Sequence, residues 1–169
     1  MAMKKSILKR IINRLLGLLA RFLPGATTIR PALHRLRGVK IRGKVFIGDD
    51  VYLENEYPEN LEIQEGAQIS LRSVLIAHTR GPGKIVIGKD VFIGANCVIT
   101  TSPGRTITIG EGAVITASTV VSSDVPSYTL FGFPKGQPLA KVTVPLTMQT
   151  SYEQFLGGLK PLNSTKSRG

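Results

Sequence analysis

The chain has 169 residues, with 22 Lys or Arg against 11 Asp or Glu and a formal net charge of +11. This length predicts one domain with appendages. The single cysteine excludes a disulfide within the chain, which suits the cytoplasm, and one cysteine with two histidines provides no zinc-ligand cluster. We therefore expect no metal.

The positive charge is concentrated at the N-terminus. Residues 1–44 contain twelve Lys or Arg and no Asp or Glu, whereas the rest contains ten bases and eleven acids. Within residues 1–25, apolar side chains recur at helical spacing, at Ile7, Leu8, Ile11, Ile12, Leu15, Leu18, Leu19, Phe22 and Leu23, opposite Lys4, Lys5, Lys9, Arg10, Arg14 and Arg21. Pro24 and Gly25 end the predicted basic amphipathic helix.

This helix predicts contact with an anionic membrane surface through residues 4–23. Internal charges disfavour both a membrane span and a secretory signal. On an anionic surface each Lys or Arg adds about 1 kcal/mol of attraction. We expect a cytoplasmic protein, peripheral on the inner face of the membrane. The alternative is that the apolar face packs on the coil or on a neighbouring subunit. Nucleic acid is not an expected partner, because no aromatic stacking platform is visible.

Residues 26–40 connect this helix to a segment, residues 41–126, with a six-residue period. Aliphatic residues take the first position at Ile41, Ile47, Leu53, Ile63, Ile69, Leu75, Ile87, Ile93, Ile99, Ile109, Ile115 and Val121. A period of six fits neither a helix nor an alternating strand. It fits a triangular parallel coil in which three hexads advance the chain by about 4.8 Å.

The other hexad positions agree with such a coil. Small or β-branched residues take the fifth position, at Val45, Val51, Ala67, Ser73, Thr79, Val91, Cys97, Ala113 and Thr119, and are predicted to fill cramped inner corners. Glycine follows the aliphatic residue at Gly48, Gly88, Gly94 and Gly110. The pattern resembles the hexapeptide-repeat proteins, which implies an all-β, left-handed parallel β-helix of about four coils.

The turns of the predicted coil are longer than eighteen residues, and the extra residues follow the third hexad of each turn. They fall around 56–60, 78–84 and 102–106. Three loops are thus expected along one edge, where chemistry usually lies. The sequence also predicts a C-terminal extension at residues 127–162, with a short helix at 151–159 packed against the coil end, and a disordered tail at residues 163–169.

His78 stands at the foot of the second loop. A neutral imidazole can take a proton from a hydroxyl, as acyl transfer from a thioester requires. His78, Gly81 to Lys84, Val86 to Ile99 and Gly110 to Val121 together resemble the hexapeptide-repeat O-acetyltransferases of the maltose, galactoside and capsular-polysaccharide type. The resemblance implies a His78 general base, acetyl-CoA as donor and a homotrimer with the site between subunits.

The roles of the residues around His78 are predicted from equivalent hexad positions in neighbouring coils and from this resemblance. Glu56, at the same hexad position one coil earlier, or Glu54 beside it, is expected to orient the imidazole. Asn55 is the candidate for the acceptor sugar, together with Glu54 and Arg80. The coenzyme is assigned to Ala95, Ala117, Ser118, Ser123, Lys135 and Lys141, although Ser118 and Ser123 replace a glycine and a lysine of the family pattern.

The predicted function is O-acetyl transfer from acetyl-CoA to a sugar hydroxyl by direct attack, with Cys97 inward and no covalent intermediate. The basic helix favours a lipid-linked or polysaccharide acceptor, as in capsule, exopolysaccharide or lipopolysaccharide synthesis. Two alternatives remain: an acyl carrier protein as donor, or a β-helix scaffold or assembly protein without catalysis.

Overall fold

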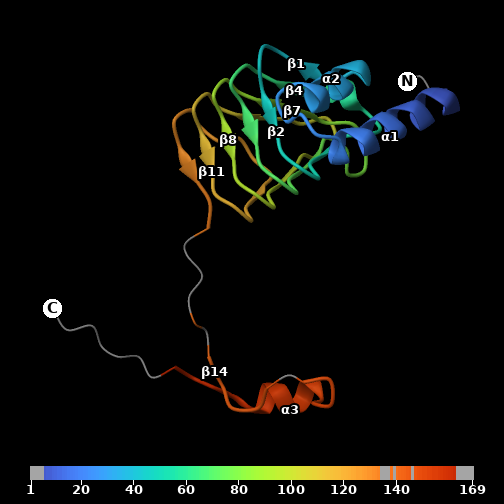
Figure 1. Cartoon of the computed structure of the whole chain (residues 1–169). Coiled ribbons are helices and arrows are strands. Elements are labelled where there is room, and N and C mark those ends of the chain that lie inside the picture. Colours follow the sequence, from blue (N-terminus) through green and yellow to red (C-terminus); the bar gives the residue numbers. More distant parts are fainter. Residues whose placement is uncertain (1–5, 134–137, 139, 146, 163–169) are drawn as a thin grey trace. The chain divides into compact units, whose positions relative to one another are not determined.

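The structure is a computed structural model that describes residues 6–133, 138, 140–145 and 147–162. The chain divides into two units, residues 1–133 and residues 134–169, and each is described by itself. The first unit contains a parallel β-helix and two helices (Figure 1).

The β-helix has about four turns, and each turn consists of short strands separated by corners. In chain order these are β1 (Lys40–Ile41), β2 (Phe46–Ile47), β3 (Tyr52–Leu53), β4 (Leu61–Ile63), β5 (Gln68–Ile69), β6 (Val74–Ile76), β7 (Lys84–Ile87), β8 (Phe92–Ile93), β9 (Val98–Thr100), β10 (Thr106–Ile109), β11 (Val114–Ile115), β12 (Val120–Val121) and β13 (Leu130–Phe131). They form three parallel sheets, in the orders β1-β4-β7-β10, β13-β11-β8-β5-β2 and β12-β9-β6-β3. The predicted fold class is confirmed.

The register confirms the six-residue period. Within the first sheet, Ile41 pairs with Ile63, Ile63 with Ile87, and Ile87 with Ile109. The same stacking of aliphatic first positions occurs in the other two sheets. These side chains form a single buried core, because every turn places its aliphatic residue directly above that of the preceding turn.

Corners of the β-helix follow the prediction with one exception. The fifth-position residues are buried except Thr79, which is exposed because the 78–84 loop leaves the coil at that point. A Cβ atom added at Gly94 would lie 2.5 Å from the backbone nitrogen of Ala117 in the next turn. Glycine is therefore required there by the close approach of two turns.

The β-helix extends past residue 126 through β13, which pairs with β11 through Val114↔Leu130 and Ile115↔Phe131. Val125 also forms a parallel bridge with Ile109. The chain thus begins a further turn at Val125, which follows Val121 by four residues instead of six.

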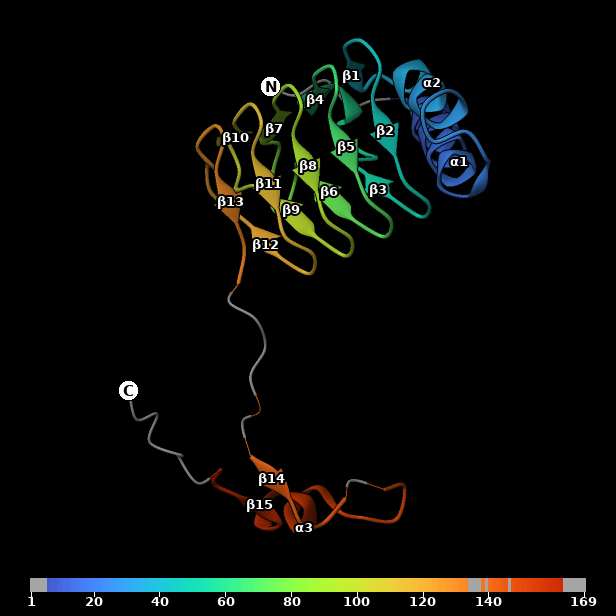
Figure 2. The same cartoon turned by 60° about the vertical axis from the view of Figure 1, so that its left-hand side comes forward.

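Two helices lie at the β1–β3 end of the β-helix (Figure 2): α1 (Ile7–Phe22) and α2 (Ile29–Leu36). The sequence analysis predicted α1 but not α2, which occupies most of the connector. The Ile47 N–H donates to the Ala26 carbonyl at 2.8 Å, and the Asp50 N–H donates to the Arg21 carbonyl at 2.9 Å. These bonds cover backbone groups at the edge of the first turn, which would otherwise be open to pairing with another chain.

Helix α1 packs on the first unit through small and polar residues. Asn13, Gly17 and Ala20 are buried, whereas the large apolar side chains other than the partly buried Leu16 stay exposed, with exposed fractions from 45% at Ile12 to 75% at Ile7. The apolar face therefore does not pack on the coil, and that part of the alternative interpretation is wrong. No helix among the described residues is both long and apolar enough to span a membrane.

The three predicted loops stack against one another along one edge. The first contains the 3-10 helix η1 (Pro58–Asn60), and Asn60 Nδ2 donates to the Gly83 carbonyl at 2.7 Å. The Gly104 N–H donates to the Pro82 carbonyl at 2.9 Å. The rigid edge so formed carries His78.

The second unit contains β14 (Lys141–Val142) and β15 (Leu159–Lys160), paired antiparallel, and α3 (Tyr152–Gly157). A capping box between Ser151 and Gln154 begins α3, which confirms the predicted short helix. The predicted tail at 163–169 lies outside the described residues, as do Lys4, Lys5 and Lys135.

Candidate active site

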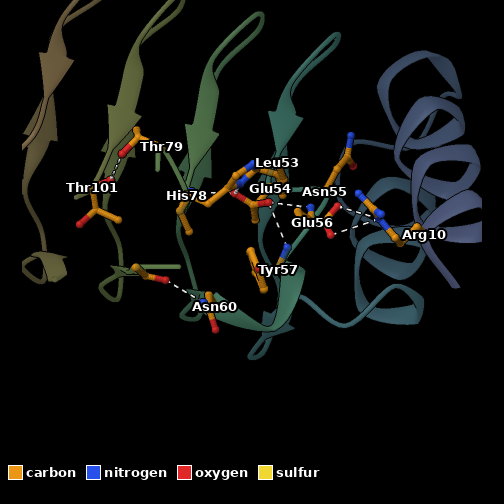
Figure 3. A network of polar contacts seen from close by, with 12 residues as sticks. Arg10, Leu53, Glu54, Asn55, Glu56, Tyr57, Asn60, His78, Thr79 and Thr101 are labelled. Atoms are coloured by element: carbon orange, nitrogen blue, oxygen red, sulfur yellow. Dashed lines mark hydrogen bonds and ion pairs between the residues drawn. The ribbon is translucent and has the colours of Figure 1, made fainter. Parts of the chain in front are cut away.

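His78 lies just after β6, where the second loop begins. Its side chain is 36% exposed, and His78 forms an antiparallel bridge with Pro82 across the loop. The Tyr57 ring meets the imidazole edge-on, with 5.9 Å between ring centroids. His78 thus lies beside an aromatic neighbour at the start of the loop (Figure 3), and part of its side chain is exposed to solvent.

The hydrogen-bond partner of His78 is Glu54, which directly follows β3. Glu54 is fully buried, and its Oε2 atom lies 2.6 Å from His78 Nδ1. Three backbone N–H groups also donate to this carboxylate: those of Glu56 and Tyr57 to Oε1, at 2.6 and 3.0 Å, and that of Ala77 to Oε2, at 2.9 Å. A buried carboxylate with this many donors is satisfied in its ionised form.

These bonds fix the tautomer of His78. An ionised carboxylate only accepts hydrogen bonds, so Nδ1 must carry the hydrogen that points to Glu54. The lone pair of the neutral ring then lies on Nε2. The arrangement supplies a proton acceptor whose orientation is set by a buried anion.

Arg37, which sequence reasoning missed, holds the segment that carries Glu54. It is buried and donates to the carbonyls of Leu53 and Glu54, at 2.7 and 2.6 Å, and to Asn55 Oδ1 at 2.8 Å. Burial lowers the pKa of Arg37 to about 10, so the guanidinium remains charged at neutral pH. Because Arg37 belongs to the connector, outside the hexad pattern, no motif marked it.

His34 completes the support for Arg37. It is fully buried, and its Nδ1 accepts a hydrogen bond from Arg37 Nε at 2.9 Å. Burial and the adjacent Arg37 charge lower the pKa of His34 to about 3. The histidine is therefore neutral and structural, in contrast to the half-exposed His78.

A pocket of about 430 Å³ opens beside His78, between α1 and the first turns of the β-helix. Its lining consists of Arg14, Gly17, Leu18 and Arg21 from α1, and Tyr52, Leu53, Asn55, Glu56 and His78 from the β-helix. Gly17 allows the close approach of α1, because a Cβ there would lie 2.7 Å from Asn55 Oδ1. The N-terminal helix is thus one wall of the candidate site.

Of the two carboxylates that the sequence analysis offered for orienting His78, the structure places Glu54 and not Glu56 against the ring. Glu56 forms an ion pair with Arg10 of α1 at 3.2 Å, and the bond to His78 Nδ1 comes from Glu54. The reason is that residues 55–57 wrap around the Glu54 carboxylate as the first loop leaves the coil. Asn55 does line the pocket, whereas Arg80 is exposed on the second loop.

The residues assigned to the coenzyme are spread over two units. Ala95, Ala117 and Ser118 lie at stacked corners of neighbouring turns, where the Ser118 N–H donates to the Ala95 carbonyl at 2.8 Å. Ser123 is exposed near the end of the third sheet. Lys141 belongs to the second unit, in β14, and Lys135 lies outside the described residues.

Cys97 points inward, as predicted. It is fully buried, its Sγ atom lies 3.1 Å from the Thr116 carbonyl oxygen, and burial raises the pKa of the thiol. A buried thiol of raised pKa is a poor nucleophile. Among the described residues, no group of three or more His, Cys, Asp or Glu is arranged to hold a metal ion.

Comparison with known proteins agrees with the six-residue repeat. The family described as the hexapeptide repeat of succinyl-transferase matches residues 84–123. The putative acetyltransferase YvoF of Bacillus subtilis (strain 168) is 34% identical over 98 residues, which are 55% of this chain and 53% of that protein. The chain thus contains the hexapeptide repeat and is similar to a protein named as a putative acetyltransferase.

Two further similar proteins have acceptors in their names. A 2,3,4,5-tetrahydropyridine-2,6-dicarboxylate N-acetyltransferase of Staphylococcus aureus (strain bovine RF122 / ET3-1) is 29% identical over 101 residues, covering 60% of this chain and 38% of that protein. A chloramphenicol acetyltransferase of Agrobacterium fabrum (strain C58 / ATCC 33970) is 46% identical over 50 residues, covering 30% and 22%. The chain matches about half of the length of YvoF and a smaller share of the other two proteins.

Proposed function

We propose that this hexapeptide-repeat protein transfers an acetyl group from acetyl-CoA to a sugar hydroxyl. The observation that carries the proposal is the Glu54–His78 pair at a pocket, with the Nε2 lone pair of a neutral imidazole available as a base. The acetyltransferase relatives support acyl transfer as the reaction class. The oxygen acceptor, the sugar and the coenzyme are parts of this proposal.

The reaction is a direct displacement. His78 Nε2 takes the proton of the acceptor hydroxyl while its oxygen attacks the acetyl carbonyl, and a backbone N–H of a facing coil stabilises the oxyanion. The tetrahedral intermediate collapses, the C–S bond breaks, and the coenzyme A thiolate takes up the proton from the imidazolium. Glu54 stabilises the imidazolium through Nδ1. Cys97 takes no part in this scheme.

The coenzyme would lie along the stacked corners that contain Ala95, Ala117 and Ser118, with a cyclic trimer placing these corners of one subunit opposite His78 of the next. Ser123, Lys135 and Lys141 are the further candidates for its polar end. Asn55, beside His78, and Arg80 are the candidates for the acceptor.

The acceptor in this proposal is lipid-linked, at the cytoplasmic face of the membrane. Helix α1 supports this, because it exposes a continuous apolar face, carries arginines and also lines the pocket. An interfacial helix of this kind binds anionic lipid surfaces. Capsule, exopolysaccharide or lipopolysaccharide units are acceptors that such a location would provide.

Calorimetric titration of coenzyme A and acetyl-CoA tests the donor. We expect saturable binding to the wild type and similar binding to His78→Ala, because His78 serves the chemistry rather than coenzyme affinity. With a sugar acceptor, His78→Ala should lower kcat by about 10² to 10⁴. Absence of binding at millimolar coenzyme would contradict the acetyl-CoA donor and leave a carrier-protein donor or a scaffold.

A further inference from the structure

Three arginines form a stripe along α1, between its exposed apolar face and its buried face. Arg10, Arg14 and Arg21 are separated by four and seven residues, which places them on one side of the helix. This stripe borders the pocket, since Arg14 and Arg21 line it. Two positive groups therefore line the pocket that contains the candidate base, and Arg10 extends the stripe beyond it.

Two members of the arginine stripe are neutralised by the β-helix. Arg10 pairs with Glu56 at 3.2 Å, and Arg21 Nε donates to Asp50 Oδ1 at 2.8 Å. Within the part of the chain that the structure describes, Arg14 between them has no acidic partner. A guanidinium that faces a pocket without a counter-ion is a site for a ligand anion.

Arg14 also connects the pocket to the apolar face. It lines a second, shallower groove of about 230 Å³, together with Ile7, Arg10 and Ile11. Ile7 and Ile11 are exposed members of the apolar face, with 75% and 50% of their surface accessible. In order along the surface, the molecule thus presents apolar side chains, then Arg14, then the pocket with His78.

We propose that Arg14 binds the phosphate of a lipid-linked sugar phosphate, with the lipid on the Ile7–Ile11 side and the sugar in the pocket. The lipid, the phosphate and the sugar of such a ligand follow one another in the same order as the apolar side chains, Arg14 and the pocket on the protein surface. Guanidinium groups bind phosphate oxygens through paired N–H donors, which a lysine at this place would not reproduce. The inference rests on the proposed function, and it specifies the acceptor class as a phosphodiester between lipid and sugar.

The test uses two soluble probes, octyl glucosyl phosphate and octyl glucoside, below the concentrations at which they form micelles. They differ by the phosphodiester alone, so their dissociation constants isolate its contribution. We expect the wild-type chain to bind the phosphate probe about tenfold more tightly, and Arg14→Gln to lose this preference. Arg42→Gln is the matched control, because Arg42 is 74% exposed on the β-helix and lines neither the pocket nor the groove on α1.

Three results would overturn the inference. Equal affinity of the wild type for the two probes would remove the phosphate subsite, and equal losses in Arg14→Gln and Arg42→Gln would reduce the effect to overall charge. Weaker coenzyme A binding by Arg14→Gln would assign Arg14 to the donor instead. The proposed function fails separately: if the wild type prefers the phosphate probe but does not bind acetyl-CoA, the anion subsite stands and the donor is wrong.

Discussion

The geometry of His78 depends on Glu54, whose carboxylate accepts hydrogen bonds from three backbone N–H groups and from Nδ1. In Glu54→Gln an NH₂ group replaces one carboxylate oxygen. In one orientation of the amide this NH₂ group faces the N–H groups of Glu56 and Tyr57, and in the other it faces the imidazole of His78. We expect kcat to fall by about 10² or more, because the wrong tautomer would then place hydrogen on Nε2. Steady-state kinetics should show an unchanged KM for acetyl-CoA.

The variant Glu56→Gln distinguishes the role of Glu56 from that of Glu54. Since the bond to the ring comes from Glu54, this variant should lower kcat only a few-fold, through loss of the ion pair with Arg10. A loss in Glu56→Gln as large as that in Glu54→Gln would contradict the orienting role of Glu54. Both variants must first show the thermal transition of a folded chain, because a buried donor left unsatisfied costs about 1–3 kcal/mol.

His34 predicts a pH dependence of stability. Its pKa is about 3 in the folded chain, against an ordinary value of 6.5. Between these pH values His34 is protonated in the unfolded chain and neutral in the folded chain. The free energy of unfolding is therefore highest above pH 6.5 and declines as the pH falls towards 3. The slope from this group is at most about 1.4 kcal/mol per pH unit. Urea unfolding at pH 7, 6, 5 and 4 measures it.

A matched variant isolates the His34 contribution. His34→Gln keeps a side-chain acceptor for Arg37 but does not titrate. Its stability should therefore depend less steeply on pH between 4 and 6.5 than that of the wild type. Parallel slopes for the two proteins would assign the acid sensitivity to other groups, for example to the protonation of surface carboxylates.

At the scale of the elements, close contact between turns predicts the cost of enlarging a corner. Alanine at Gly94 would place its Cβ 2.5 Å from the Ala117 backbone nitrogen, where no side chain can move aside. We expect Gly94→Ala to destabilise the β-helix by about 1–3 kcal/mol, visible as a lower thermal midpoint. Gly157→Ala in α3 has nothing within 4 Å and should leave the β-helix transition unchanged.

The elements that the sequence predicted well are those whose pattern repeats. Each hexad gives the same information, so Ile41, Ile63, Ile87 and Ile109 could be assigned to one stack from spacing alone. Helix α2 occurs once and is short, and its buried positions include Arg30 and His34, which no hydrophobic pattern indicates. Periodicity therefore predicted the scaffold and not the part that buttresses the site.

The same distinction explains the candidate site. The hexad spacing predicted that Glu56 lies beside His78 in the neighbouring turn. The observed pairing of Leu53 with Leu75 agrees, because Glu56 and His78 each follow their paired leucine by three residues. The sequence could not show that the chain turns around the Glu54 side chain after β3, since that turn is made by hydrogen bonds to a carboxylate rather than by turn residues. A position in a repeat predicts where the backbone lies, and local hydrogen bonds decide which side chain reaches its neighbour.

At the scale of the whole molecule, charge and exposed apolar surface occur together on α1. Ile11 and Leu15 are about half exposed, and residues 1–44 contain all of the excess positive charge. We expect the protein to sediment with vesicles that contain anionic lipids and to be released by salt, which screens charges over about 8–10 Å. Neutral vesicles should bind it far less.

The double variant Ile11→Gln and Leu15→Gln tests the apolar part of this contact. Both side chains point away from the β-helix in α1, so the folded unit should persist while vesicle binding falls by about tenfold or more, since each substitution removes most of a buried aliphatic side chain. Light scattering coupled to gel filtration gives the subunit number of the same samples. If the variant keeps its vesicle affinity but loses subunits, the apolar face packs on a neighbouring subunit, and the lipid surface is not its partner.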